Sequence, residues 1–293
     1  MKSVFVTGAS GFIGGHIARA LAARWEVCAP AHSELELSDE AAVSAFFSGK
    51  YFDAVIHCAA KPGHRNAKDP SGIFYENTRQ FFNLARQKSR FRKMIFISSG
   101  MVYDRRHYIP LMKEDYFDAH VPADEAGFAK YVCAKYAEAA ENIIELRPFG
   151  VYGPGEDYAI RFISNAVCKA VCGLPITVKR NRKFDYVHVD DLVLAVEHFI
   201  ASDGKHKSYN AASGKPVELV EIARKVAEIS GSQTEIIVRE QGMDAEYSAD
   251  IARLAEEIPG FPRVSLDDGI RELYDWYLAR KDTLNKECLL FDK

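Results

Sequence analysis

A tyrosine and a lysine four positions apart are the residues of this sequence best suited to transfer a proton. Tyr131 and Lys135 stand in KYVCAKYAEAAENII, where helical periodicity places both on one side of a predicted helix. A free tyrosine has a pKa of about 10, and a nearby ammonium lowers it by favouring the phenolate. The tyrosine could then exchange a proton with a substrate hydroxyl or carbonyl. The same spacing also occurs as an ordinary surface pair, so the surroundings have to decide between the two.

A serine at the end of a predicted strand supports the chemical interpretation. Ser98 and Ser99 follow the apolar run KMIFI, and ligands of doubly wound sheets bind where the parallel strands end. A hydroxyl there could polarise the carbonyl that the tyrosine protonates. Ser98 is expected to face the core or to bond the backbone, which leaves Ser99 as the third catalytic candidate.

A glycine-rich turn near the N-terminus predicts a dinucleotide site. The run TGASGFIG joins a predicted strand, SVFVTG, to a predicted helix, FIGGHIARALAAR. Gly8 permits a tight turn, Gly11 lets the backbone approach a pyrophosphate, and Gly14 lets the helix pack close to the strand. The helix N-terminus adds N–H groups and a positive dipole end for the phosphates. A glycine turn without a ligand is the alternative that the pattern alone leaves open.

The end of the second predicted strand bears on the choice of cofactor. An acid about 20 residues beyond the glycines would favour NAD by binding the ribose 2′-hydroxyl. WEVCAPA is followed instead by His32 and Ser33. Both could hydrogen-bond a 2′-phosphate, although His32 could equally be a solvated loop residue. The predicted cofactor is therefore NADP or NAD, with NADP preferred.

The order of the predicted elements indicates the fold class. Through residue 150, short apolar strands alternate with helices, which predicts an α/β fold with a Rossmann-type doubly wound parallel sheet. We expect a dinucleotide-binding core over 1–150 and a smaller C-terminal, mainly substrate-binding region over 151–293 that interleaves with it. Later helices are predicted at AIRFISNAVCKAV, DDLVLAVEHFI (with Asp190 or Asp191 as N-cap), VELVEIARKVAEIS and SLDDGIRELYDWYLAR.

Composition disfavours several other classes of protein. The net charge of −3 gives no electrostatic case for binding nucleic acid or an anionic membrane. No run approaches the roughly 18 apolar residues of a membrane span, and the apolar run in MKSVFVTG is too short for a signal peptide. The six cysteines form no CxxC pair. Reduced thiols, no metal and a cytoplasmic location are therefore expected.

Several short motifs follow one another along the chain: TGASGFIG, FDAVIHCAA, FISSGMVYD, YVCAK, LRPFGVYGPG, YVHVDDLV and SLDDGIRELYDWY. Taken in this order, they resemble the extended short-chain dehydrogenase/reductase family in its nucleotide-sugar epimerase and 4-ketoreductase branch. The resemblance implies that Ser99, Tyr131 and Lys135 are catalytic and that the C-terminal region holds a nucleoside diphosphate. The resemblance also implies a set of cofactor contacts, to which we add Ser10, His32 and Ser33 from the residues themselves. The predicted cofactor site comprises Gly8, Ser10, Gly11, Phe12, Ile13, Gly14, His32, Ser33, Glu36, Leu37, Ala59, Ala60, Lys61, Tyr131, Lys135, Pro148 and Phe149.

The predicted substrate site departs from the family pattern. Phe184 stands where relatives often carry a diphosphate-binding Arg, and Gly150 stands where they often carry an Asn. One of the cations at 180, 182 and 183 could substitute for that Arg, and Arg239 lies close to a second expected Arg. A solvated basic loop is the alternative. The predicted substrate contacts are Ser99, Gly100, Met101, Arg182 and Arg239.

The two positions after Ser99 limit the reaction. The family's 4,6-dehydratases carry an Asp-Glu pair after the catalytic residue, and GDP-fucose synthases, which also epimerise, carry a Cys there. Gly100 and Met101 occupy these places. Reduction of a 4-keto nucleotide-sugar, with hydride transfer and Tyr131 as proton donor, is therefore predicted. The alternatives are a C4 epimerase with tightly bound NAD and a non-catalytic NAD(P)-binding regulator; a homodimer is expected, as in many relatives.

Other polar residues are expected to be structural or peripheral. His57 is expected to be a satisfied core histidine, Tyr103 to pack structurally, and His188 to stabilise the loop before a helix. His64 and Arg65 are expected near the mouth of the substrate site.

Overall fold

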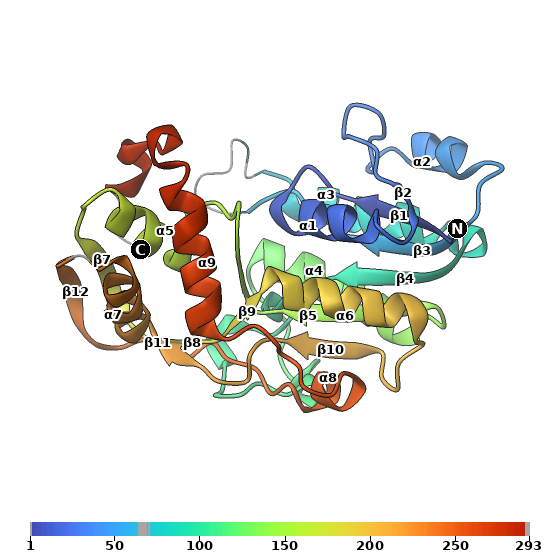
Figure 1. The fold of residues 1–293 in the computed structure, drawn as a ribbon. Helices are drawn as coiled ribbons and strands as arrows, with labels where there is room; N and C mark the ends of the chain where they lie inside the picture. The colour runs from blue at the N-terminus through green and yellow to red at the C-terminus, as the bar shows by residue number, and fades with distance from the viewer. Residues whose placement is uncertain (1, 64–68, 70, 232, 291–293) are drawn as a thin grey trace.

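A single parallel sheet forms the centre of the computed structural model, which describes residues 2–63, 69, 71–231 and 233–290 (Figure 1). Its six strands lie in the order β10-β5-β4-β3-β1-β2, and every pair is parallel. The chain runs from β1 outward to β2 and then crosses back to β3, so the predicted doubly wound fold is confirmed. The strands are β1 (Ser3–Thr7), β2 (Glu26–Cys28), β3 (Phe52–His57), β4 (Phe91–Ile97), β5 (Ile143–Pro148) and β10 (Ser208–Ala211).

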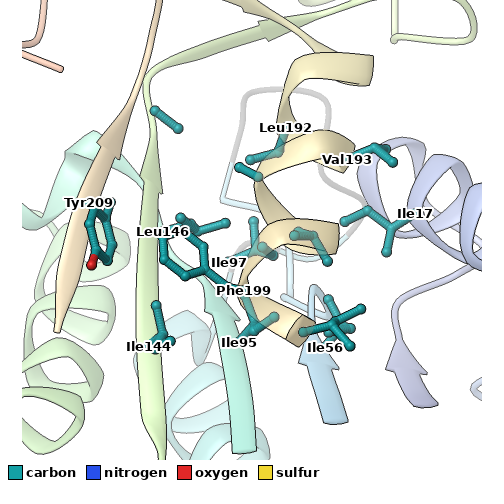
Figure 2. Packing of buried hydrophobic residues seen from close by; sticks show 14 of the residues in the cluster. Ile17, Ile56, Ile95, Ile97, Ile144, Leu146, Leu192, Val193, Phe199 and Tyr209 are labelled. Atoms are coloured by element: carbon teal, nitrogen blue, oxygen red, sulfur yellow. The ribbon is translucent and has the colours of Figure 1, made fainter. Parts of the chain in front are cut away.

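Helices cover both faces of this sheet, because the strands are apolar on both sides. On one face, Ile17 and Phe199 from two different helices share a buried cluster with Ile56, Ile95 and Leu146 of the strands (Figure 2). A second cluster joins three helices to the opposite face. The first face carries α1 (Phe12–Leu21) and α6 (Val189–Ala201); the second carries α2 (Glu40–Phe47), α3 (Ile73–Ala85) and α4 (Glu125–Ala139).

Two strands of the sheet, β5 and β10, were not predicted from the sequence. The predicted helix that contains Tyr131 ran on through Ile144, whereas α4 ends at Ala139 and β5 begins at Ile143. Every residue of β5 is buried, so the alternation that marks a half-exposed strand is missing. α4 also begins earlier than predicted, because the Asp124 carboxylate caps it by accepting from the Gly127 N–H at 2.9 Å.

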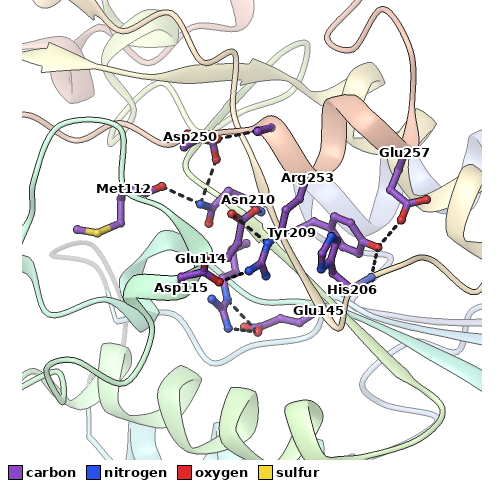
Figure 3. Close-up of polar contacts among 12 residues, drawn as sticks. Met112, Glu114, Asp115, Glu145, His206, Tyr209, Asn210, Asp250, Arg253 and Glu257 are labelled. Carbon is purple, nitrogen blue, oxygen red and sulfur yellow. Dashed lines mark hydrogen bonds and ion pairs between the residues drawn. The ribbon is translucent and has the colours of Figure 1, made fainter.

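Buried hydrogen bonds hold β10, which comes from the C-terminal half of the chain, at the edge of the sheet (Figure 3). The Asn210 N–H donates to a Glu114 carboxylate oxygen at 2.8 Å, and its side-chain amide donates to the Met112 carbonyl at 2.8 Å. The Tyr209 hydroxyl donates to Glu257 at 2.7 Å. Because these groups are buried, losing one partner would leave the other unsatisfied, so the network fastens the C-terminal half to the sheet.

The remaining elements form a second, smaller cluster beyond one end of the sheet (Figure 1). Its helices are α5 (Phe162–Val171), α7 (Leu219–Ser230) and α9 (Leu266–Leu278), and its strands β7 (Ile176–Asn181) and β12 (Ile236–Met243) pair with each other. Short elements connect it to the sheet: β6 (Gly150–Tyr152), β8 (Lys183–Phe184), β9 (Tyr186–His188), β11 (Val217–Glu218) and α8 (Ala252–Glu257). Within the described part of the chain, no helix combines the length and the apolar character needed to cross a membrane.

The prediction that Asp190 or Asp191 is the N-cap of α6 is wrong. The helix begins at Val189, and the imidazole of His188 caps it by accepting from the Asp190 N–H at 3.3 Å. His188 therefore stabilises the start of this helix, as predicted. Asp191 instead accepts from the Arg263 N–H at 2.8 Å, which ties α6 to the segment that leads into α9.

Candidate active site

A cavity of about 480 Å³ opens where β1 and β3 end, at the point where the chain reverses its direction across the sheet. We call it the cofactor cavity. The predicted cofactor residues that line it are Gly8, Ser10, Gly11, His32, Glu36, Leu37, Ala59, Ala60 and Lys61. The lining does not include Phe12, Ile13, Gly14, Ser33, Tyr131, Lys135, Pro148 or Phe149.

The glycine turn at this cavity is packed too closely for larger residues. Gly8 has a φ of +70°, and a methyl group there would lie 2.7 Å from the Ala59 nitrogen. A methyl group at Gly14 would lie 2.3 Å from the Gly8 carbonyl oxygen. No side chain caps α1 at Gly11, and its first turn contains no acid. The N–H groups of that turn therefore remain available to an anion, and the turn fits a pyrophosphate.

The rim of the cofactor cavity carries the groups that could bind a ribose. The His32 imidazole lies 3.1 Å from the Glu36 carboxylate and is 81% exposed. The other Glu36 oxygen accepts from both the N–H and the hydroxyl of Ser38 at 2.8 Å. The Glu36 side chain is thus held in place, and through it the imidazole, at the entrance of the cavity.

A buried histidine supports the turn that follows β3. The Thr7 hydroxyl oxygen accepts from the N–H groups of Cys58 and Ala59, both at 3.1 Å, and lies 2.9 Å from His57 Nδ1. Burial lowers the pKa of His57 to about 3, so the ring is neutral and Nδ1 can accept the Thr7 hydrogen. His57 is therefore a satisfied core histidine, as predicted. This network sets the position of Ala59 in the cavity wall.

A lysine that the sequence prediction passed over reaches the end of β4. Lys130 Nζ donates to the Ile97 carbonyl at 3.2 Å and lies 4.8 Å from the centroid of the Phe96 ring. Its charge also acts on the thiol of Cys58, which lines the cofactor cavity. Burial lowers the pKa of Lys130. An ammonium between the ends of β3 and β4 can donate to the hydroxyls of a ligand that extends from the cavity along the strand ends.

Tyr131 and Lys135 have a different partner. Both donate to the Asp118 carboxylate, Lys135 at 2.9 Å. The hydrogen bond that the Tyr131 hydroxyl donates to Asp118 raises the pKa of Tyr131. Lys135 lowers this pKa, as predicted, but the raising effects outweigh it and the net shift is upward. α4 ends where β5 begins and hence runs away from the edge at which the strands end, which puts Lys135 about 7.5 Å farther from that edge than Lys130. The structure therefore gives the predicted pair no place in the lining of the cofactor cavity.

Ser99 lies just beyond β4, and a tyrosine from far along the chain approaches it. The Ser99 hydroxyl accepts from the Met101 N–H at 3.2 Å and is also hydrogen-bonded to Tyr247. Tyr247 is in turn hydrogen-bonded to Tyr108, whose hydroxyl donates to the Gly100 carbonyl at 3.2 Å. Three hydroxyls thus form a chain at the carboxyl end of the sheet. Of the predicted substrate contacts beside Ser99, Gly100 is buried and Met101 is exposed.

A second cavity of about 430 Å³, which we call the basic cavity, lies beside β7, β12 and the start of α5. Arg180 pairs with Glu240 at 2.7 Å, and Arg182 pairs with Asp244. Arg239 is exposed and is not part of the lining, because side chains alternate along β12 and Glu240 is the one that faces in. The cations in the lining are Arg161, Lys179, Arg180 and Arg182.

Aromatic rings connect the basic cavity to Ser99. Phe184 and Tyr186 line the cavity and stack with their centroids 4.7 Å apart. Phe184 lies 4.8 Å from the Tyr247 ring, and Tyr247 lies 4.6 Å from Phe149. The Ser99–Tyr247 pair is therefore placed between the basic cavity on one side and Lys130 with the cofactor cavity on the other.

Comparison with known proteins decides the family. Residues 4–212 match the model of the NAD dependent epimerase/dehydratase family. This chain belongs to that family. It is 30% identical to a dTDP-4-dehydro-6-deoxy-D-allose reductase from a Streptomyces species, over 96% of this chain and 97% of the other. It is 22% identical to the GDP-L-fucose synthase of Escherichia coli strain K12, over 96% and 98%.

Solved structures of the same fold include a reductase and an epimerase of nucleotide-linked sugars. A GDP-mannoheptose C4 reductase from Campylobacter jejuni with NADP bound superposes with a TM-score of 0.82, at 22% identity over 94% of this chain and 98% of the other. A UDP-glucose 4-epimerase from Thermotoga maritima gives 0.81, at 23% identity over 96% and 100%. The family resemblance inferred from the motifs is thus confirmed.

The sequence prediction missed two residues of this epimerase/dehydratase-family site. Lys130 precedes the predicted Tyr131 by one position, so it shares the motif but points to another side of the helix. Tyr247 is remote in sequence, and no local pattern marks it. Tyr103 packs structurally, as predicted: its hydroxyl donates to Asn210 at 2.9 Å. His64 and Arg65 lie outside the described residues.

Proposed function

We propose that this protein is an NADPH-dependent reductase that acts on a nucleoside diphosphate 4-keto-sugar. The observation that carries the proposal is the position of the Ser99 hydroxyl between a cavity shaped for a dinucleotide and a cavity lined by cations. Hydride transfer needs the nicotinamide and the keto carbon to meet at one point. Ser99 follows β4, next to the strand ends that border the cofactor cavity, and its partner Tyr247 contacts Phe184 of the basic cavity. The match to 4-keto-sugar reductases over nearly the whole chain supports the same reaction class.

The residues divide the task between the two ligands. When bound, the nicotinamide cofactor supplies the hydride. The turn from Gly8 to Gly14 would hold its pyrophosphate and Lys130 the hydroxyls of its second ribose. Ser99 would hydrogen-bond the carbonyl oxygen of the sugar, where negative charge develops during reduction. His32 at the rim of the cavity supports NADP over NAD, because an imidazole can donate to a 2′-phosphate.

The basic cavity suits the nucleoside diphosphate. Arg161 and Arg182 offer planar donors that match phosphate oxygens. Phe184 and Tyr186 offer ring faces for a base or sugar, and Phe184 occupies the position where an Arg was expected. Relatives are described with dTDP and GDP sugars, so both nucleotides belong in the first substrate panel.

Consumption of NADPH with a panel of GDP- and dTDP-linked 4-keto-sugars tests this function. A reductase oxidises one NADPH for each sugar reduced. A C4 epimerase would interconvert epimers without net consumption, and a regulator would bind NADPH without turning over any sugar. Binding constants for NADPH and NADH, measured by fluorescence, test the cofactor preference, and tighter binding of NADH would contradict it.

We also propose that the protein works in the cytoplasm as a homodimer joined through α3 and α4. Its six cysteines are free thiols, which suits a reducing compartment. Tyr75, Phe128 and Tyr136 are exposed aromatic residues on these two helices, and such a patch suits an interface. A monomer mass in multi-angle light scattering at micromolar concentration would contradict the dimer.

A further inference from the structure

We infer that Tyr247, and not Tyr131, is the phenol that donates a proton to the substrate carbonyl. The inference rests on the proposed reductase function and names the acid of that reaction. Tyr247 lies in the segment between β12 and α8, outside all of the sequence motifs that identified the family.

The hydrogen bonds of the two tyrosines distinguish them. Tyr247 is hydrogen-bonded to Ser99, the hydroxyl at the end of β4, while the hydroxyl of Tyr131 is committed to Asp118. A proton donor has to share the carbonyl oxygen with the residue that polarises it. Of these two phenols, Tyr247 is the one in contact with Ser99, and it lies beside Phe184 of the basic cavity.

Gly100 makes room for this arrangement. A methyl group at position 100 would lie 2.5 Å from the Tyr247 hydroxyl and 2.9 Å from the Phe149 ring. Both contacts are well inside van der Waals distance, so any larger residue would push Tyr247 away from Ser99. The glycine after Ser99 and the tyrosine at 247 therefore depend on each other.

Helix α4 offers no competing hydroxyl at this point. Lys130 reaches the end of β4 from this helix, and the residue one turn before it, on the same face, is Ala126. A methyl side chain cannot transfer a proton. The acid for a carbonyl beside Lys130 therefore has to come from another segment, and Tyr247 supplies it.

The step is balanced as an ordinary carbonyl reduction. The keto carbon accepts a hydride from the reduced nicotinamide, its C–O π bond breaks, and the oxygen takes the proton from Tyr247. The resulting phenolate recovers a proton from solvent through Tyr108. Burial raises the pKa of Tyr247 well above its ordinary value, so the phenol is protonated at neutral pH, as a donor must be.

The test compares Tyr247→Phe with Tyr131→Phe, using the full-length enzyme and the best substrate from the panel. We expect Tyr247→Phe to lower kcat about 100-fold or more, the usual contribution of a general acid, with an unchanged Kd for NADPH. Tyr131→Phe should keep a kcat close to that of the wild type. Tyr51→Phe, at a residue 59% exposed and remote from both cavities, is the control for loss of a phenol.

Two further measurements separate proton donation from a structural role. Replacing Tyr247 by a fluorinated tyrosine lowers the phenol pKa, so the fall of kcat at high pH should move to lower pH. Gly100→Ala should lose activity as Tyr247→Phe does, even if the latter is poorly folded. Near-normal kcat in a folded Tyr247→Phe, or inactivity of Tyr131→Phe alone, overturns the inference. A wild-type enzyme that consumes no NADPH with any sugar overturns the reductase function itself.

Discussion

The cofactor cavity and the basic cavity prepare for phosphate in different ways. In the first, the N–H groups of an uncapped helix turn face the cavity, and the glycines around them leave no side chain in competition. In the second, the cations already hold carboxylates: Arg180 is paired with Glu240 and Arg182 with Asp244. Backbone donors are fixed by the fold, whereas side-chain donors must change partners when a substrate arrives.

This difference suggests separate roles for the two cavities. A site made of backbone accepts one ligand shape and tolerates few sequence changes, because the glycines leave no space. A site made of ion pairs favours a ligand with more charge and more acceptors than a carboxylate, such as a diphosphate. We therefore expect substitutions at the first cavity to act on the cofactor and those at the second to act on the substrate.

The largest expected effect is at the glycine turn. Gly14→Ala forces a methyl group against the Gly8 carbonyl, backbone against backbone, at 2.3 Å. We expect NADPH binding to weaken about 100-fold, which corresponds to the upper part of the range for overpacking. Fluorescence titration measures it. Gly15→Ala, on the same helix but outside the cavity lining, where a methyl group would lie 3.0 Å from the Ala9 carbonyl oxygen, is the matched control and should lose much less; equal losses would contradict the steric explanation.

The next effect tests which lysine serves the cofactor. Lys130→Met removes the ammonium at the ends of β3 and β4, and we expect NADPH to bind about 30-fold more weakly, as for the loss of a hydrogen bond to a charged group. Lys135→Met breaks only the exposed contact with Asp118. Titrations of both variants decide the matter: a larger loss at Lys135 would restore the lysine that the motif predicted.

A smaller effect is expected at the basic cavity. Arg182→Ala removes a phosphate donor but also frees Asp244, so we expect KM for the nucleotide-sugar to rise about tenfold while Kd for NADPH stays constant. Steady-state kinetics measures KM for the nucleotide-sugar, and titration measures Kd for NADPH. Arg239→Ala, at an exposed position outside the lining, is the control. An increase in Kd for NADPH would show that the cavities do not act separately.

The last effect concerns the pH dependence of stability, not ligand binding, and it belongs to the basic cavity alone. Burial raises the pKa of Glu156 in its lining to about 8, and Ser164 donates to the carboxyl at 2.5 Å. An acid with a higher pKa in the folded state binds its proton more tightly there. Its contribution to stability is therefore complete below the ordinary pKa of 4.5 and is lost as the pH rises through about 8.

Glu156→Gln removes this titration and should flatten the pH dependence. We expect the Tm of the wild type to fall by a few degrees more than that of the variant between about pH 5 and pH 8, since one pKa unit corresponds to roughly 1.4 kcal/mol. Thermal melts at both pH values measure it. Parallel melting curves would contradict a protonated Glu156.

Prediction from sequence succeeded where chemistry and contacts are local. The glycine turn, the strands β1, β3 and β4, and the buried histidine at 57 all follow from residues close together in the chain. It failed for β5, which lacks any alternation because both its faces are buried, and for β10, a four-residue strand whose place depends on Glu114 and Met112. Local patterns contain no information about such distant partners.

The candidate catalytic residues also divide into those that local sequence marks and those that only distant contacts place. By itself the sequence determined the family through the resemblance of its motifs, the parallel sheet through periodicity, and a turn suited to phosphate through the missing side chains of glycine. It also placed a lysine and a tyrosine side by side on α4, but could not say which faces the strand ends. Only the tertiary structure decided that: α4 starts at Glu125 and packs so that Lys130 reaches Ile97, while Asp118 binds Tyr131 and Lys135 elsewhere. It also brought Tyr247 to Ser99, because Gly100 leaves the space for its ring.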